Sequence, residues 1–192
     1  MEGIGWENSE IATGSTILIR PNQTTPDADG NTVYADKRVR QALSMAVDNN
    51  ICLELGYANK GQTADNHHAG SMHPEHDPSV GRLPFDPAKA KALMDEAGMA
   101  DYEHELISID DDWRKNTTDA VAAQLRDAGI KVKRTILPGS TFWNDWAKYP
   151  FSSTNWNHRP FAVQVWGLAY RSGEAWNEMG WSNAEFDALL AE

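Results

Sequence analysis

The stretch AVAAQLRDAGIKVKRTIL, residues 120–137, decides the fold class that the sequence predicts. It begins inside a helix predicted over residues 112–128, because apolar side chains recur there at helical spacing and Gly129 follows as a stop signal. Residues 130–136 then alternate apolar and polar side chains, which indicates a strand. Arg134 interrupts the apolar side of that strand, so we expect the strand at an edge of its sheet. A helix followed directly by a strand is typical of a layered α/β domain.

The alternation of helices and strands continues on both sides of this stretch. Strands are predicted over residues 15–20, 105–109 and 151–156. Helices are predicted over residues 36–48 with Asp36 as N-cap, 51–55 with a stop at Gly56, 86–98 with Asp86 as N-cap, and 160–170 opened by Pro160. A short helix capped by Ser140 or Thr141 and a last helix opened by a capping box, Ser182–Glu185, complete the list. Residues 57–84 show no period and are expected to form a long functional loop.

Composition narrows the class of protein. The chain has 192 residues, with 17 Lys and Arg against 28 Asp and Glu, and a net charge of −11. This length suits a single α/β domain over residues 1–192. The acidic balance argues against a nucleic-acid partner, because such domains present a basic face. No apolar run approaches the roughly 18–20 residues of a membrane span. The opening residues, MEGIGWENSE, lack the basic and then apolar layout of a signal peptide.

The common enzyme signatures are missing from the sequence. It contains no GxxxxGK[ST], GxGxxG, GxSxG or HExxH motif. The single cysteine, Cys52, has apolar neighbours and is expected to be a structural thiol rather than a nucleophile. We therefore expect a protein without catalytic residues and without a cofactor.

Four of the six histidines lie within ten residues of the long loop, beside Asp65 and Asp77. Imidazole and carboxylate groups in one loop could hold Zn²⁺ or Ni²⁺. Their spacing matches no known ligand pair, and polar histidines are common in loops, so no metal site is predicted. The four histidines of this loop, the candidate metal ligands, are His67, His68, His73 and His76.

Aromatic, polar and cationic side chains follow each other where the strand at residues 151–156 ends. The carboxyl edge of an α/β sheet is where ligands bind, and the candidate ligand-binding residues here are Trp156, Asn157, His158 and Arg159. The Trp156 ring could form one side of a ligand site, and Arg159 could bind a carboxylate through two parallel hydrogen bonds. The alternative is a core tryptophan beside a solvated arginine. The sequence has eight tryptophans; we expect Trp113 and Trp146 to pack on helix faces.

Four segments in order resemble one family, the extracytoplasmic solute-binding proteins of ABC importers in the oligopeptide, dipeptide and nickel class (family 5). They are DKRVRQALSMAVDNN (Asp36–Asn50), FDPAKAKALMDEAG (Phe85–Gly98), AVAAQLRDAGIKVKRTIL (Ala120–Leu137) and WSNAEFDALLAE (Trp181–Glu192). The resemblance implies a periplasmic, non-catalytic protein of two lobes that closes on a solute and delivers it to a permease in the inner membrane. It implies a mixed sheet flanked by helices, a type II-like lobe. This chain would be most of the C-terminal lobe, without the signal peptide, the N-terminal lobe or the C-terminal return segment.

The resemblance carries over only part of the binding site. Peptide-binding members have a tryptophan after this strand, which Trp156 matches, followed closely by an acidic residue for the ligand's amino group. Asn157, His158 and Arg159 include no acid, so the solute is expected to be peptide-like or another small polar molecule, with Arg159 favouring an anionic or polyhydroxyl group. Two alternatives stay open: a nickel or metal-chelate carrier using the loop of His67–His76, and a metal-dependent hydrolase using the same histidines with Asp65.

Overall fold

The computed structural model describes residue 5, residue 7 and residues 9–192. The prediction that the opening residues form no signal peptide concerns, in part, residues 1–4, 6 and 8, which lie outside the described residues. Within the described residues, no helix has both the length and the apolar character that crossing a membrane requires.

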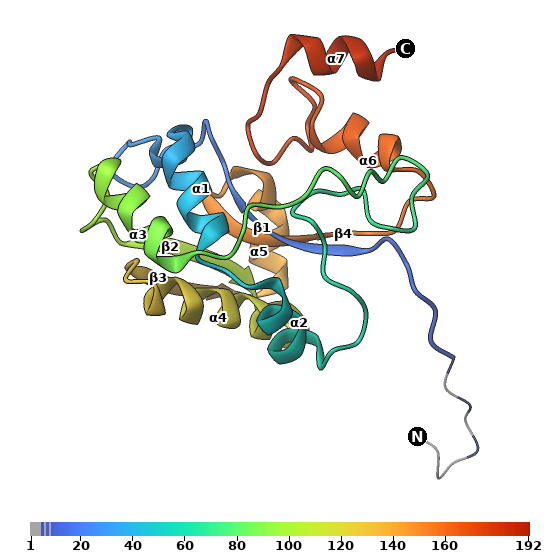
Figure 1. Cartoon of the computed structure of the whole chain (residues 1–192), viewed down its shortest axis with the longest axis horizontal. Coiled ribbons are helices and arrows are strands. Elements are labelled where there is room, and N and C mark those ends of the chain that lie inside the picture. Colours follow the sequence, from blue (N-terminus) through green and yellow to red (C-terminus); the bar gives the residue numbers. More distant parts are fainter. Residues whose placement is uncertain (1–4, 6, 8) are drawn as a thin grey trace.

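A four-stranded mixed sheet forms the centre of the structure (Figure 1). Its strands are β1 (Thr16–Pro21), β2 (His104–Ile109), β3 (Val132–Leu137) and β4 (Phe151–Trp156), in the order β1-β4-β2-β3. Strand β4 runs parallel to β2 and antiparallel to β1, and β2 runs parallel to β3. The predicted α/β fold with a mixed sheet is confirmed. So is the edge position of the strand that carries Arg134.

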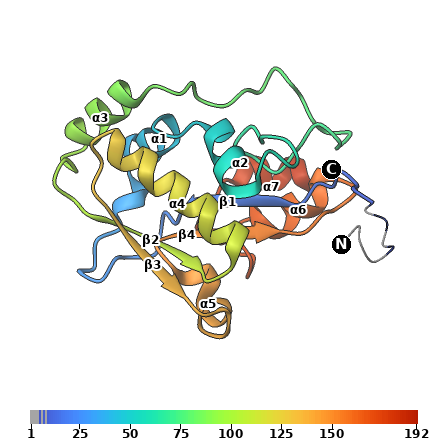
Figure 2. The same ribbon diagram turned by 90° about the horizontal axis from the view of Figure 1, so that it is seen from below.

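Four helices cover one face of the sheet, which we call the helix face (Figure 2). They are α1 (Lys37–Met45), α2 (Asn49–Tyr57), α3 (Pro87–Glu96) and α4 (Asp112–Asp127). An apolar core joins α1, α3 and α4 to the strands, and Val39, Met94, Leu106 and Leu125 in it are almost completely buried. Burial of side chains of this size contributes about 1.5–3 kcal/mol each, so this core holds the fold together.

Two helix starts on the helix face follow the sequence signals closely. The carboxylate of Asp36 accepts a hydrogen bond from the backbone N–H of Arg38 and caps α1. The carboxylate of Asp86 accepts from the N–H of Lys89, and Pro87 occupies the first turn of α3. Each cap satisfies a backbone donor that the first helical turn leaves free. Both capping predictions are confirmed.

The prediction that a helix stops at Gly56 is wrong. Helix α2 continues through Gly56 to Tyr57, and Ala58 takes the left-handed conformation that ends it. A Cβ atom on Gly56 would lie 2.1 Å from Oγ1 of Thr117 on α4. The glycine therefore allows α2 and α4 to approach closely.

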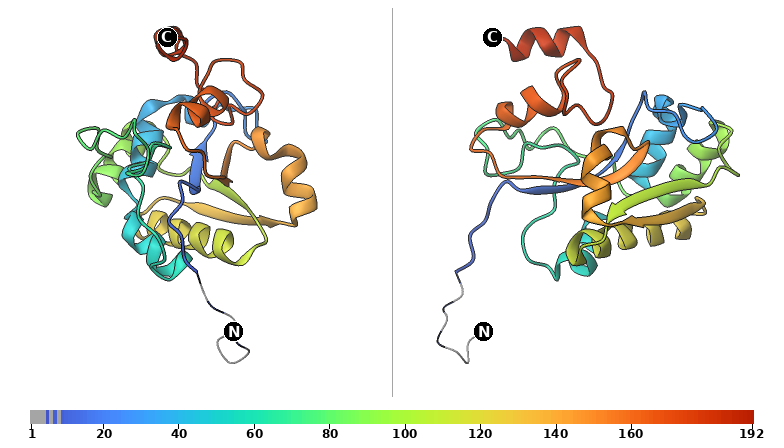
Figure 3. Two further views of the ribbon diagram at one scale, coloured as in Figure 1. Left: turned by 90° about the vertical axis from the view of Figure 1, so that its right-hand side faces the viewer. Right: turned by 180° about the vertical axis from the view of Figure 1, so that it is seen from behind.

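Smaller elements lie on the other side of the sheet or at its end (Figure 3). They are α5 (Gly139–Asp145), the 3-10 helix η3 (Trp146–Lys148), α6 (Ala162–Ala169) and α7 (Ala184–Leu190). A further 3-10 helix, η2 (Val33–Ala35), precedes α1 and packs in the core of the helix face. Phe142 of α5 packs on Ile107 and Ile109 of β2, so α5 covers the face opposite the helix face. Figure 3 shows α6 and α7 at the end of the sheet, away from α3.

The starts of these three α-helices differ from the predictions, because their N-terminal amides find other partners. Helix α5 begins directly after Pro138, whose carbonyl accepts from the amides of Thr141 and Phe142, so neither Ser140 nor Thr141 is the cap. Helix α6 begins at Ala162 rather than Pro160, because the carboxylate of Glu75 accepts from its first amides. Helix α7 is capped by Asn183; the hydroxyl of Ser182 pairs with that of Ser172 instead.

Candidate functional site

Four tryptophans gather where the parallel strands end. Trp143 and Trp146 come from α5 and η3, Trp156 ends β4, and Trp176 lies in the segment of residues 171–183. The ring centres of Trp156 and Trp176 are 5.8 Å apart, and Trp146 lies 6.4 Å from Trp156, 6.1 Å from Trp176 and 6.4 Å from Trp143. Trp143 is 41% exposed and Trp176 47% exposed. We call these four residues the tryptophan face.

Trp156 forms the back of the tryptophan face. Its side chain is buried against Val165 and Ala169 of α6, and the His68 ring meets it edge-on at 5.5 Å. Its indole N–H donates to Oε1 of Glu178 at 2.7 Å. The structure thus places the predicted Trp156 at the carboxyl edge of the sheet, with Trp146 and Trp176 packed beside it. The prediction that Trp146 packs on the surface of a helix is met only in part, because Trp146 lies within the aromatic cluster of the tryptophan face.

Behind Trp156 lies a buried ion pair that the sequence reasoning missed. Nε of Arg20 is 2.7 Å from Oε2 of Glu178, and the two side chains are 1% and 0% exposed. The hydroxyl of Thr154 also donates to the Glu178 carboxylate, at 2.9 Å. Burial raises the pKa of Glu178 and lowers that of Arg20, while their opposite charges favour the ionised forms. One signal was available: Arg20 interrupts an otherwise apolar strand and shares a face with Leu18.

The three residues after Trp156 lie at the surface. Asn157 and His158 are exposed and Arg159 is half-buried. His158 holds the incoming end of β1, because its Nδ1 accepts from the amide of Gly14 at 2.9 Å. The Arg159 guanidinium donates to the carbonyl of His158 and forms no salt bridge with any described residue. Its charge is therefore available to a partner at this edge.

The four candidate metal histidines bind different partners. His68 pairs with the hydroxyl of Tyr170 at 2.7 Å, and burial lowers its pKa to about 4, so its ring is neutral near pH 7. His73 accepts from the amide of Gly70 at Nδ1, so its Nε2 carries the proton donated to the Arg159 carbonyl. His76 reaches Asp65 at 3.4 Å, and the His67 ring lies tilted beside that of His76, with the ring centres 6.3 Å apart.

These contacts fix the long loop against the end of β4 and against α6. Among the described residues, no group of three His, Cys, Asp or Glu side chains is arranged to hold a metal ion. The nickel-carrier and hydrolase alternatives therefore gain no support from the structure.

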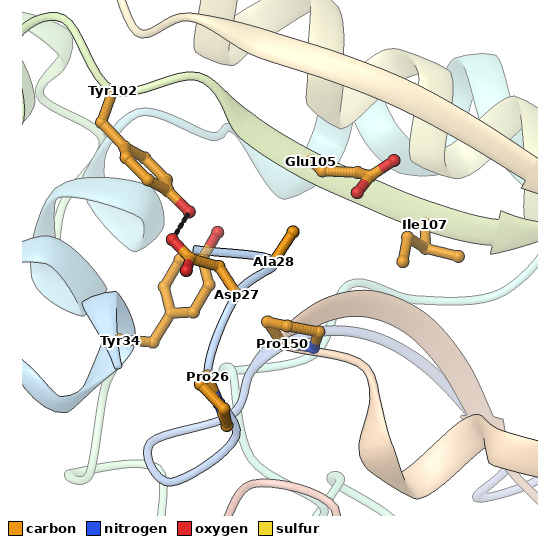
Figure 4. A pocket seen from close by; sticks show the side chains of 8 residues that line it. All are labelled: Pro26, Asp27, Ala28, Tyr34, Tyr102, Glu105, Ile107 and Pro150. Carbon is orange, nitrogen blue, oxygen red and sulfur yellow. Dashed lines mark hydrogen bonds between the residues drawn. The ribbon is translucent and has the colours of Figure 1, made fainter. Parts of the chain in front are cut away.

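A separate cavity of about 260 Å³ lies near the amino end of β2 (Figure 4). The hydroxyl of Tyr102 donates to the Asp27 carboxylate across one side of it, at 2.8 Å, and Glu105 lines another side. It is lined by Pro26, Asp27, Ala28, Tyr34, Tyr102, Glu105, Ile107 and Pro150. None of the predicted site residues contributes to it, so it is distinct from the tryptophan face.

Comparison with curated proteins finds relatives that bind small molecules. Over 176 residues the chain is 27% identical to heme-binding protein A of Haemophilus influenzae. The match covers 83% of this chain and 31% of that relative. Over 66 residues it is 41% identical to a dipeptide-binding protein of Pseudomonas aeruginosa, covering 33% of this chain and 12% of the relative. The chain thus spans less than a third of the length of these relatives.

Solved structures share the fold. The structure of HbpA2 from Haemophilus parasuis matches with a TM-score of 0.81 and 22% identity, over 94% of this chain and 36% of that one. OppA of Listeria monocytogenes, bound to a peptide, matches with a TM-score of 0.74 and 23% identity, over 95% and 38% of the two chains. The model of one family, bacterial extracellular solute-binding proteins, family 5 Middle, matches residues 2–177. The chain belongs to this family of bacterial extracellular solute-binding proteins.

Proposed function

We propose that this chain is one lobe of the solute-binding component of an ABC importer and that it binds its solute at the tryptophan face. The lobe is the C-terminal one, and a second lobe closes over the solute before it is passed to a permease in the membrane. The protein works outside the cytoplasm and binds its solute without transforming it. Membership of the family and the likeness of the fold to peptide-bound OppA support this proposal.

The observation that carries the proposal is the exposure of two tryptophans at the carboxyl edge of the sheet. Trp143 and Trp176 leave 41% and 47% of their surface exposed, although both belong to one aromatic cluster. Exposed apolar patches of this kind mark sites of binding, and α/β folds bind ligands at this edge. Closure of a second lobe would bury the patch together with the solute.

The side chains at this edge favour a solute with an apolar part and an anionic or polyhydroxyl part. The tryptophans supply the apolar wall, and Arg159 supplies a cation that pairs with no described acid. Glu178, an acid close to Trp156, is fully buried and paired with Arg20, so it does not replace an acceptor for a ligand's amino group. A peptide-like solute held by its carboxylate or side chains, or another small polar molecule, fits this arrangement.

Native mass spectrometry of the protein purified from its own host tests the proposal. We expect a co-purifying solute whose occupancy falls at least about tenfold in Trp176→Ala and Arg159→Ala. Trp113→Ala is the matched control, because Trp113 lies on α4 and packs against Tyr57 and Arg114 on the helix face. Equal losses in the control and in the two site variants would contradict the site assignment.

A further inference from the structure

The buried pair of Arg20 and Glu178 contacts three of the four tryptophans. The Glu178 carboxylate accepts the indole N–H of Trp156, and the Glu178 amide donates to the carbonyl of Trp176 at 2.8 Å. The Arg20 guanidinium donates to the carbonyl of Trp146 and also to those of Tyr149 and Glu178. One ion pair therefore ties β1, η3, β4 and the segment of residues 171–183 together.

The segment that carries Trp176 is seated closely on the chain that follows β1. Nδ2 of Asn22 donates to the carbonyl of Glu178 at 2.9 Å, and the amide of Gln23 donates to the carbonyl of Met179. Gly180 has φ +62°, and a Cβ there would lie 2.3 Å from Oγ1 of Thr24. The segment has no regular secondary structure, so these contacts and the packing of the Trp176 ring on Trp146 and Trp156 fix the position of Trp176.

Stability alone does not account for this pair. Burying two charges costs several kcal/mol of hydration, and replacing a buried ion pair by apolar side chains of similar volume is often neutral or stabilising. Apolar side chains would fill the space, but they could not accept the indole N–H of Trp156 or donate to three carbonyls. Directional bonds from charged groups are what apolar packing lacks.

We infer that Arg20 and Glu178 are positioning residues that set the orientation of the tryptophan face for the solute. The inference rests on the proposed function. Both side chains are closed off from solvent, so they act through Trp146, Trp156 and Trp176 rather than by touching the solute.

The double variant Arg20→Met/Glu178→Leu separates positioning from stability, because it removes both charges at similar volume. We expect it to fold, with unchanged far-ultraviolet circular dichroism. We expect it to lose most of the near-ultraviolet signal of the tryptophans, to be quenched more strongly by acrylamide, and to hold its co-purified solute about tenfold more weakly. If the double variant does not fold, the same measurements are made on Arg20→Met/Glu178→Gln, which also leaves no unpaired charge and keeps the shape of the Glu178 side chain.

Asp119→Asn is the matched control, since it breaks the ion pair of Arg134 with Asp119 on the helix face. Its tryptophan signals and solute occupancy should equal those of the wild type. Unchanged tryptophan signals and solute occupancy in the double variant would overturn the inference and leave the proposed function standing. The spectra are recorded without solute, so a changed signal in a protein that binds no solute would instead support positioning and contradict the proposed function.

Discussion

The two faces of the sheet differ in what they bury. On the helix face, the strands bury apolar side chains such as Leu106 and Phe151 against α1, α3 and α4. On the opposite face, the same strands bury Arg20 and Thr154 around the Glu178 carboxylate, with partly exposed tryptophans above them. The first arrangement stabilises the fold mainly through apolar burial. The second costs hydration energy but defines the orientation of side chains at the carboxyl edge.

Two arginines show the same contrast. Arg134, on the edge strand β3, has a side chain that is only 10% exposed, but its partner Asp119 is 40% exposed, so this pair reaches water through the carboxylate. Arg20 is 1% exposed and its partner is fully buried. A pair whose carboxylate reaches water keeps part of its hydration and avoids much of the cost of burying both charges. A completely buried pair beside the proposed solute-binding edge fits the positioning role that we infer for Arg20 and Glu178.

The largest expected effect comes from the helix face. Leu125→Ala removes a side chain with no exposed surface from the core, and it should lower the free energy of unfolding by about 2–5 kcal/mol. The near-ultraviolet signal of the tryptophans should stay unchanged in the folded variant. Leu189→Ala, at a position that is 62% exposed, is the control and should shift stability by less than about 0.5 kcal/mol. Urea unfolding measures both; equal shifts would refute the role given to this core.

A smaller effect is expected from two glycines inside helices, Gly56 and Gly167. Gly56→Ala places a methyl group against Thr117 and should destabilise the protein by about 1–3 kcal/mol, although alanine is the better helix former. Gly167→Ala in α6, where nothing lies within 4 Å of the added carbon, should be neutral or stabilising by up to about 1 kcal/mol. Thermal unfolding of both variants checks the difference. A Gly56→Ala protein as stable as the Gly167→Ala protein would contradict the close approach of α2 and α4.

Features set by neighbours in the sequence were the ones that could be predicted. The caps at Asp36 and Asp86, the edge strand with Arg134 and the placement of Trp156 at the end of β4 depend on residues close by along the chain. Together with the alternation of helices and strands, they were enough for the fold class.

Features set by distant residues could not be predicted. The start of α6 depends on Glu75, 87 residues before Ala162, and the setting of Trp156 depends on Glu178, 22 residues beyond it. The role of Gly56 could not be predicted from local sequence, because its partner, Thr117, lies on another helix. The aromatic cluster combines tryptophans from three separate segments, and no local pattern shows that they meet.

Binding of the solute at the tryptophan face should protect the backbone there from hydrogen exchange with the solvent. Hydrogen–deuterium exchange of the protein with and without the solute identified by mass spectrometry measures this. We predict slower exchange in α5, at residues 154–162 and at residues 174–180, which carry or flank the tryptophan face. Protection confined to residues 26–34 and 102–107, around the cavity at the amino end of β2, would contradict the account.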